Sequence, residues 1–327
     1  MALNPIQANQ VLTAGLQANF AHTYAASARA NREKLAKVMS MGEAAGARVT
    51  PLGYFQSAVY PEHWPYGDPI PEGTHDSVSY NVTIRRWAKR IKWNRDDVTD
   101  EQTHTLKQRA LQLGEHFGTL HERVFFQLLQ ATVDAALLPG PLPNAPDGAA
   151  FFATAAGGVN RFGVASGNLL TGNGVADIAS IQRDYYRAIT QFTRMTDTQG
   201  QPLHNPGDSD RGVCVIFNTA NKEIFERAFH GSLVQGIAAG ISNIVLDTRK
   251  GVDLWETQRV TTDDWFTFMT GDPLKATAQF DKEGLETTEA DWSNSDEART
   301  LDHGYFQAKA RYGYVINLPY QALQVNN

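Results

Sequence analysis

Apolar side chains recur at steps of three and four residues over a long stretch of the first half of the chain. They are Leu106, Ala110, Leu113, Phe117, Leu120, Val124, Leu128 and Ala131. This spacing places them on one face of a helix. The acidic run 96–101 precedes them and suits the positive end of a helix dipole. The pattern predicts one uninterrupted helix over 103–137, roughly 50 Å long at about 1.5 Å per residue.

A period of two replaces this pattern immediately before the helix. Residues 80–95 are rich in β-branched and aromatic side chains, which favours an extended strand. Two further strand-like segments, 274–280 and 305–316, flank a charged turn region, 291–302. We interpret them as two long antiparallel strands that can pair with the 85–95 ribbon beside the long helix.

The N-terminal segment has a helical pattern of its own. Its apolar residues recur at four-residue steps: Leu12, Leu16, Phe20 and Tyr24. They predict a short amphipathic helix over 6–24, followed by a basic, helix-prone stretch, 29–37. Such an arm is too short to be a domain, so its apolar face requires a partner. Two partners remain open, the arm's own domain and a neighbouring subunit.

Residues 51–78 differ in composition from their surroundings. Their five prolines exclude a helix or a central strand. Large aromatic side chains lie between the prolines: Tyr54, Phe55, Tyr60, Trp64 and Tyr66. Aromatic residues on a segment with little core of its own are typical of an interaction surface. We therefore interpret the segment as an excursion that contacts another chain; a proline-rich surface loop is the alternative.

The second half of the chain alternates helices and strands. Helical patterns over 175–195 and 221–230 enclose a buried strand, 212–218, and this order indicates an α/β subdomain. Small strands at 244–246 and 265–269 can extend its sheet. The single cysteine, Cys214, lies inside the buried strand, where a nucleophile is inaccessible and a disulfide partner is absent.

Length and charge narrow the classes of protein. The 327 residues correspond to about two domains, and a hydrophobic content of 42% is sufficient for a core. The formal charge of −6 argues against tight non-specific binding to duplex nucleic acid, which depends on cationic side chains. The sequence contains neither a secretory signal nor an apolar run of the ~18 residues that a membrane span needs. We expect a soluble protein made in a reducing cytosol.

No group of reactive side chains in the sequence favours catalysis or metal binding. His116 and His121 are five residues apart rather than at the spacing of a zincin. The pairs that they form with Glu115 and Glu122 are interpreted as solvated groups on a helix surface. The acids of 96–101 are better explained by helix capping than by general acid–base catalysis.

Six basic residues alternate with two tryptophans before the long helix. They are Arg85, Arg86, Lys89, Arg90, Lys92 and Arg95, with Trp87 and Trp93. Such a series can bind nucleic acid, but alternation along a strand divides the charges between two faces. Ion pairing with acidic loops of a neighbouring subunit is at least as good an interpretation, and nucleic acid remains the alternative.

The order of these elements resembles the major capsid proteins of tailed phages with the HK97-type fold, and more narrowly the Mu-like major head subunit family. The motifs that carry the resemblance are Trp87…Ile91…Trp93-Asn-Arg95-Asp96-Asp97-Val98, Asp147-Gly148…Phe151-Phe152, Asn168-Leu-Leu-Thr-Gly172, Asp197-Thr-Gln-Gly200-Gln-Pro-Leu203, Asp263-Asp264-Trp265 and Tyr312-Gly-Tyr314. They follow the family's order and span about 80–323. The loop motif Glu62-His-Trp64…Gly67-Asp68 matches the family pattern only loosely.

The resemblance implies an α+β fold with four parts. They are an N-arm (1–48), an extended E-loop (49–84), a P-domain (85–172 and 273–314, spine helix about 103–137) and an A-domain (173–272 and 315–327). Copies are expected to form pentamers and hexamers and to close into an icosahedral shell around double-stranded DNA. Residues 50–78 contain no lysine, so no covalent cross-link through an E-loop lysine is expected.

The resemblance also implies a structural protein of the virion capsid, assembled in the host cytoplasm, with no enzymatic activity and no cofactor. Its implied partners are further copies of itself, a separate scaffolding protein, a maturation protease, a portal, packaged double-stranded DNA, and decoration or cement proteins. Two alternatives stay open: an encapsulin-like shell around protein cargo, and a soluble α/β enzyme that uses the acids of 96–101.

Large buried rings dominate interface energies, so the aromatic excursion and the arm are the expected anchors between subunits, together with the charged segment before the long helix. The expected contact residues are Leu16, Phe20, Tyr54, Phe55, Trp64, Tyr66, Arg85, Arg86, Arg90, Arg95, Asp96 and Asp97. Several weak contacts per subunit, combined through effective concentration, can hold a shell together.

Overall fold

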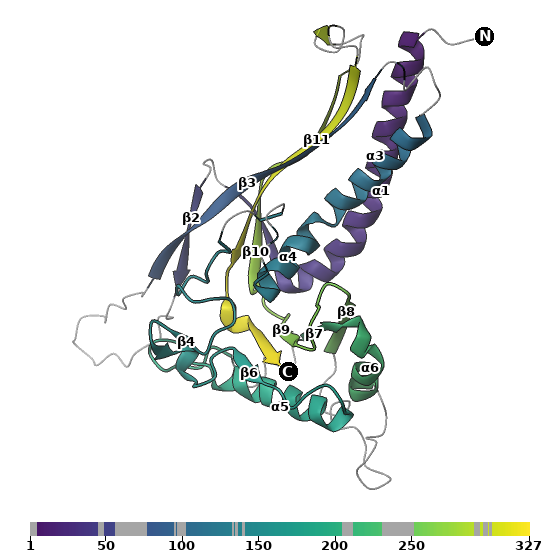
Figure 1. Ribbon diagram of the computed structural model, residues 1–327. Helices are drawn as coiled ribbons and strands as arrows, with labels where there is room; N and C mark the ends of the chain where they lie inside the picture. The colour runs from purple at the N-terminus through teal and green to yellow at the C-terminus, as the bar shows by residue number, and fades with distance from the viewer. Residues whose placement is uncertain are drawn as a thin grey trace, which may run out of the picture.

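The computed structural model shows an elongated molecule, in which a limb of long helices and long strands extends from a lower body (Figure 1). The structure describes residues 5–44, 49–55, 77–94, 96, 103–132, 134, 137–138, 141–204, 212–230, 252–290, 295–296, 300 and 303–327.

The N-terminal helix α1 spans Pro5–Val38 and leads directly into strand β1 (Met39–Glu43). The predicted short helix therefore continues without a break through the basic stretch 29–37. One face of α1 packs on the chain's own core through Leu12, Leu16, Phe20, Leu35 and Val38. Of the two partners left open by the sequence, the described residues provide the first.

The predicted uninterrupted helix over 103–137 is wrong in two respects. It is divided into α3 (Thr103–Gly118) and α4 (Leu120–Gln130), with Thr119 between them at φ −95° and ψ 0°. It ends early because Ala131 adopts the left-handed conformation, with φ 51°, and its N–H donates to the carbonyl of Gln127. Apolar periodicity indicates a buried face, and this face continues past Thr119, where the backbone hydrogen bonds from Thr119 to Glu115 and from Arg123 to Thr119 are kept.

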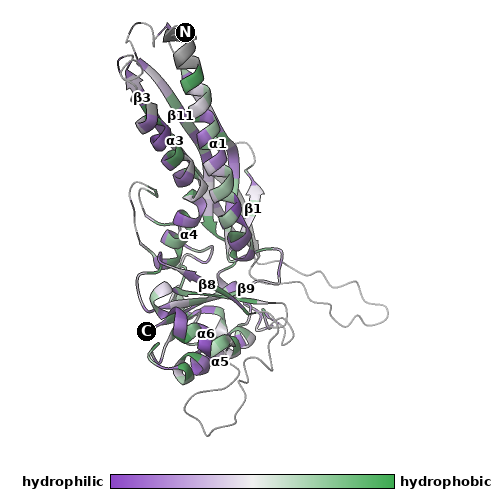
Figure 2. Ribbon diagram, turned by 90° about the vertical axis from the view of Figure 1, so that its right-hand side faces the viewer, coloured by the Kyte–Doolittle hydropathy of each residue, from purple (hydrophilic) through white to green (hydrophobic). Residues whose placement is uncertain are grey.

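Helices α1 and α3 lie side by side along the limb (Figures 1 and 2). Two glycines of α3, one turn apart, permit their close approach. A Cβ at Gly114 would lie 2.6 Å from the carbonyl oxygen of Phe20, and a Cβ at Gly118 would lie 2.5 Å from the Cβ of Ser27. Since both distances are shorter than real Cβ contacts, α1 occupies this position only against glycine.

The first sheet has the strand order β1-β10-β11-β3-β2. Its strands besides β1 are β2 (Val49–Phe55), β3 (Ser77–Asn94), β10 (Thr277–Ala290) and β11 (His303–Ile316). Strand β11 pairs antiparallel with both β10 and β3. The prediction that the two C-terminal strands pair with each other is confirmed, and of the two only β11 pairs directly with the segment before the long helix.

One face of this sheet packs against the helices. Trp87 and Trp93 of β3 and Phe306 of β11 are buried there. The ring of Phe20 lies 5.4 Å from that of Phe306 and 6.3 Å from that of Phe117, between centroids. The indole N–H of Trp87 donates to a carbonyl beyond the end of α4. These contacts hold the helices and the sheet together as one core.

The lower body contains a second sheet, with the order β6-β12-β9-β7-β8. Its strands are β6 (Leu169–Thr171), β7 (Val213–Asn218), β8 (Val252–Thr257), β9 (Trp265–Met269) and β12 (Ala322–Asn326). The short strands β4 (Ala155–Ala156) and β5 (Val159–Asn160) pair separately.

Helices α5 (Ile178–Arg194) and α6 (Lys222–His230) lie against the second sheet (Figure 2). The predicted helix–strand–helix unit and the strand at 265–269 are therefore confirmed, including the buried position of Cys214 in β7. The strand predicted at 244–246 lies outside the described residues.

Candidate functional site

The long strands of the first sheet separate charged from apolar side chains. Strands β3 and β11 pair from Asn94 with His303 to Ile84 with Gly313. Alternation turns Trp87, Ile91 and Trp93 toward the helical core, where they are buried. The side chains that alternate with them are exposed: Arg86, Ala88, Arg90, Lys92 and Asn94.

Strands β3 and β10, which lie on either side of β11, each have an edge that is only partly covered. Among the described residues, β2 pairs with Ser77–Thr83 of β3, and β1 pairs with Thr277–Asp281 of β10. Beyond those positions, no described strand lies beside Ile84–Asn94 on one side or Lys282–Ala290 on the other. We call these two segments, with His303–Gly313 of β11 between them, the charged ribbon. Figure 1 shows it as the long strands of the limb.

The β3 edge of the charged ribbon carries three exposed cations that have no acidic partner among the described residues. None of Arg86, Lys89 and Lys92 forms an ion pair within the described part of the chain. Arg90 donates from Nε and Nη2 to Oε1 of Gln307, at 3.0 and 2.9 Å, and its guanidinium lies 3.9 Å from the ring centroid of Tyr305. These contacts orient Arg90 without neutralising it.

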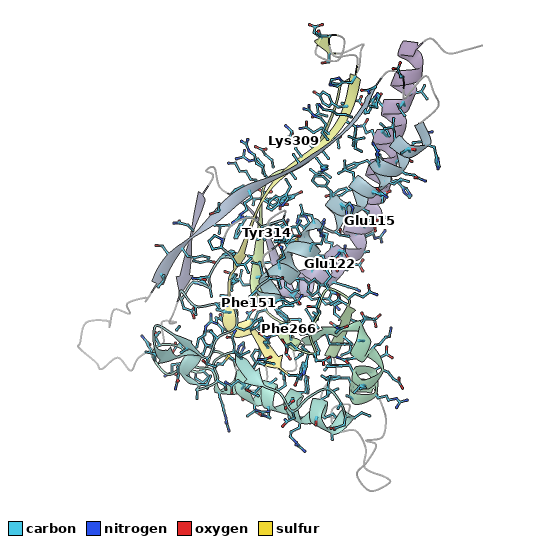
Figure 3. The ribbon with its side chains drawn as sticks, in the orientation of Figure 1. Glu115, Glu122, Phe151, Phe266, Lys309 and Tyr314 are labelled. Atoms are coloured by element: carbon cyan, nitrogen blue, oxygen red, sulfur yellow. The ribbon has the colours of Figure 1, made fainter. Side chains whose placement is uncertain are left out.

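The β10 edge is acidic. Glu283 forms an ion pair with Arg311 at 2.5 Å, and Glu286 forms one with Lys309 at 2.9 Å, so β11 supplies the cations. Both carboxylates remain partly exposed, at 41% and 58% of the side chain. Lys309 lies on the solvent side of β11, and Figure 3 shows it on the limb, with Tyr314 further toward the lower body.

The structure places some of the predicted contact residues on this surface. Arg86 and Arg90 are exposed on β3, Arg85 is half-buried there, and Asp96 is exposed just beyond the strand. Burial lowers the pKa of the Arg85 guanidinium. Tyr54 and Phe55 belong to β2, whose side chains are outside the described set. Trp64, Tyr66, Arg95 and Asp97 lie outside the described residues.

Leu16 and Phe20 occupy a different environment from the predicted one. Leu16 is fully buried and Phe20 is 2% exposed, in both cases against α3 and the first sheet of the same chain. A side chain that is already buried has no surface left for a neighbour. We therefore retain the proposal of contacts between subunits for the charged ribbon and the aromatic excursion, and not for these two residues.

A buried arginine organises the loop between α4 and α5. Arg161 donates from Nε and Nη2 to the two carboxylate oxygens of Asp147, at 2.7 and 3.0 Å. Its Nη1 donates to the carbonyls of Ala150 and Phe151 and to Oδ1 of Asn168. The sequence motifs include Asp147, Phe151 and Asn168 but not this arginine, because nothing in a loop composition distinguishes a buried arginine from a surface one.

Asn168 connects the same loop to the end of the chain. Its Nδ2 donates to the carbonyls of Phe151, Pro319 and Ala322, and the last two flank the 3₁₀ turn before β12. Figure 3 shows Phe151 and Phe266 where the limb meets the lower body. The network of Arg161 and Asn168 therefore fixes the junction between the two parts of the molecule.

The interpretation of His121 and Glu122 as solvated groups is wrong. Nδ1 of His121 forms a hydrogen bond with the hydroxyl of Tyr314 at 2.6 Å, and the ring of Tyr312 lies 4.7 Å away between centroids. Glu122 is 13% exposed and forms an ion pair with Arg259 at 3.2 Å. His121 thus contacts the first sheet, whereas Glu122 contacts the segment between β8 and β9. The exposed position of His116 agrees with the prediction.

The environment of His121 gives the stability a pH dependence. Burial lowers the pKa of His121 to about 4, and the negative charge of Asp281 opposes this change. Since the folded value lies below the ordinary one, the unfolded chain binds the additional proton. The stabilisation is therefore complete above about pH 6.5 and is lost as the pH falls toward 4. For a half-buried ring we expect a loss of about 2 kcal/mol in the free energy of unfolding.

Urea unfolding at pH 7 and pH 4.5 tests this expectation. In His121→Asn, an amide oxygen can accept the Tyr314 hydrogen bond without titrating, so the difference between the two pH values should shrink by most of that amount. An unchanged difference in the variant would assign the pH dependence to other groups.

Reactive groups of an enzyme are not assembled in the described residues. Burial raises the pKa of the Cys214 thiol to about 12, so the nucleophilic thiolate does not form near neutral pH. No three His, Cys, Asp or Glu side chains within the described ranges are grouped as metal ligands. A cavity of about 470 Å³ at the junction is lined largely by apolar side chains, among them Leu128, Phe151 and Phe266.

No described helix combines the length and the apolar character that crossing a membrane requires. Comparison by sequence finds no protein-family model that matches the chain. It finds no matching curated protein either.

Solved structures resemble the chain over most of its length. The capsid of an empty GTA particle covers 89% of this chain and 88% of its own, with a TM-score of 0.56 and 11% identity. The mature capsid of bacteriophage PhiM1 covers 89% and 85%, with a TM-score of 0.52 and 13% identity. A virus-like particle from Pyrococcus furiosus covers 94% and 98%, with a TM-score of 0.50 and 9% identity.

The shared architecture is the HK97-like fold of phage capsid proteins, with mixed helix and sheet. The fold class expected from the sequence is therefore confirmed. At 9–13% identity the likeness establishes the fold and leaves the function to be argued from the chain itself.

Proposed function

We propose that the protein is the major capsid protein of a tailed phage, which self-assembles into pentamers and hexamers of an icosahedral shell. The observation that carries this proposal is the limb. Its strand edges at Ile84–Asn94 and Lys282–Ala290 have no strand partner among the described residues, and Arg86, Lys89 and Lys92 form no ion pair there. The capsid structures that share the fold support it over at least 85% of their length. The Mu-like assignment depends on the sequence motifs.

The four-part division follows from this proposal. We assign 1–48 to an N-arm, 49–84 to an E-loop, 85–172 and 273–314 to a P-domain, and 173–272 and 315–327 to an A-domain. The limb then corresponds to the arm and the P-domain, and the second sheet to the A-domain. In this chain most of the arm is the helix α1, which belongs to the core of the limb.

The shell of a tailed phage encloses double-stranded DNA, and we propose the same content for the shell formed by this chain. The proposal also includes a scaffolding protein, a maturation protease and a portal as partners in assembly. A shell around protein cargo is the second candidate, supported by the likeness to the Pyrococcus furiosus virus-like particle. Nuclease-protected nucleic acid in particles isolated from infected or induced cells supports the first candidate, and a stoichiometric co-purified protein supports the second.

Removal of the aromatic excursion tests the shell. Phe55 and Ser77 are cross-strand partners of β2 and β3, so an Asn-Gly turn can replace 56–76 and close the hairpin. We expect this variant to remain folded and to yield capsomers or single subunits, with no closed particles in electron micrographs. The reason is that the variant lacks Trp64 and Tyr66, two of the four aromatic residues that are expected to contact the neighbouring subunit.

A second variant separates loop length from aromatic content. In it, a Gly/Ser segment of the same length replaces 56–76, and we expect the same loss of particles. Circular dichroism and the unfolding midpoint should match the wild type in both variants. Closed particles of normal size from either variant would contradict the role of the excursion.

A further inference from the structure

We propose that the charged ribbon joins copies of the chain side by side, with the basic β3 edge of one copy against the acidic β10 edge of the next. This inference rests on the proposed function, since it names the partner and the orientation of one contact in the shell. The argument uses only the described segments Ile84–Asn94 and Lys282–Ala290.

The two edges are accessible in the same way. Each belongs to an outer strand of a three-stranded region, and each has β11 on its inner side. Each therefore presents backbone N–H and C=O groups that no described strand pairs. Open edges of this length are templates for another strand. A second copy provides both a matching length and a free edge.

The two edges differ in the sign of their charge. The β3 edge contains five basic residues and no acid: Arg85, Arg86, Lys89, Arg90 and Lys92. The β10 edge contains three acids and one lysine: Glu283, Glu286, Glu289 and Lys282. The ribbon is two interstrand spacings wide, or about 10 Å. It therefore carries positive charge along one side and negative charge along the other.

Contacts within the chain do not cancel this difference. Arg311 of β11 lies opposite both Glu283 and Arg86, and its ion pair is with Glu283. Arg86 thus faces a like charge across the strand pair, which is unfavourable without an additional anion. The pairs that β11 makes with β10 are partly exposed, and exposed pairs of this kind contribute little, so the carboxylates remain available to a second cation.

Charges on edge strands often serve another purpose, which is to prevent aggregation. Protection of this kind needs repulsion between copies, and one sign of charge on both edges provides it. Opposite signs on the two edges attract instead. The arrangement in this chain therefore favours association with a defined orientation over protection.

The orientation has a geometric consequence. A contact between two different edges is heterologous, so each copy offers one free edge to the next, and a rotation that closes produces a ring. Like edges repel, so a symmetric pair of copies through this surface is disfavoured. Since the charges are exposed, association is expected to weaken as the ionic strength rises.

Charge reversal tests the contact on the full-length chain. One variant carries Arg86→Glu, Lys89→Glu and Lys92→Glu, which leave the β3 edge with three acids and two bases. A second carries Glu286→Lys and Glu289→Lys, which leave the β10 edge with three lysines and one acid. All five side chains are exposed, and among them only Glu286 has an ion pair in the described structure. For each variant alone, we expect the amount of protein in the particle fraction to fall at least about tenfold, since like charges then meet across the contact.

The combined variant, with all five substitutions, has a net negative β3 edge and a net positive β10 edge, so it restores opposite charges between copies and should recover the particles. A mixture of the two single-edge variants should also associate, because each provides the partner edge that the other lacks. A matched control reverses two exposed arginines of α5 in the lower body, Arg183→Glu and Arg194→Glu, and should assemble as the wild type does. Light scattering after gel filtration measures all these samples, and circular dichroism verifies that each is folded.

The outcomes separate this inference from the proposed function. Wild-type particle yields from both single-edge variants would overturn the edge-to-edge contact and leave the shell protein intact. A folded combined variant that fails to recover particles would overturn it as well. If the wild-type chain itself forms neither capsomers nor particles, the proposed function fails, and the inference fails with it.

Discussion

Replacement of Arg161 by methionine is expected to lower the free energy of unfolding by about 3–5 kcal/mol. The arginine is 2% exposed, and its guanidinium donates to both carboxylate oxygens of Asp147. Methionine approximates the volume of the side-chain stem but provides no donor. The carboxylate of Asp147 then loses its charge partner in a largely buried site. The carbonyl of Ala150 loses its donor, and the carbonyl of Phe151 keeps only the donor on Asn168.

Urea unfolding followed by tryptophan fluorescence measures this loss on the unassembled chain. Arg183→Met is the matched control, because Arg183 is exposed on α5, and its replacement should change stability by less than about 0.5 kcal/mol. A loss of the same size in both variants would show that the arginine network contributes nothing specific. The combination Asp147→Asn/Arg161→Met should recover part of the loss, since it removes the uncompensated charge.

Hydrophobic periodicity predicted the parts of the fold that depend on a local pattern. The strand 265–269 matches β9, the helix 175–195 contains α5, and the two C-terminal strands pair as expected. Each of these helices and strands has a continuous buried face that lies within one regular element. Such a face is visible in the sequence because its period directly reflects the geometry of the backbone.

The same reasoning failed where a distant contact decides the structure. The inward position of His121 depends on Tyr314, which lies 193 residues further along the chain. Leu16 and Phe20 appeared free to contact a neighbour because their partners on α3 and β11 are remote in sequence. A pattern shows that a face must be buried and does not show what covers it.

For the candidate surface, too, the sequence predicts the local features, and the long-range features appear only in the structure. The basic series of 85–95 was evident from the sequence, and the exposure of Arg86 and Arg90 on one face follows from alternation. The open edge of β3 and the opposite charge of β10 appear only once β11 is placed between them. The order of strands in a sheet is a long-range property, and no local period encodes it.

Gly114→Ala is expected to destabilise the chain by about 1–3 kcal/mol. In an isolated helix this substitution stabilises, because alanine has the higher helix propensity. In this chain the added Cβ would lie 2.6 Å from the carbonyl oxygen of Phe20, and both atoms belong to rigid helices. Helix α1 must then move away from α3, and the Phe20 ring moves out of its contacts with Phe117 and Phe306.

Gly15→Ala provides the control with the opposite sign. Gly15 lies in α1, and its nearest neighbour for a new Cβ is the flexible Cε of Lys107, at 3.9 Å. The alanine fits there without displacing a neighbour, so it should stabilise the chain by up to about 1 kcal/mol through helix propensity. Urea unfolding of both variants separates the two effects, since the chemical change is identical. Stabilisation by both substitutions would show that α1 can move away from Gly114 without a loss of stability. The close contact at Gly114 would then not hold the limb together.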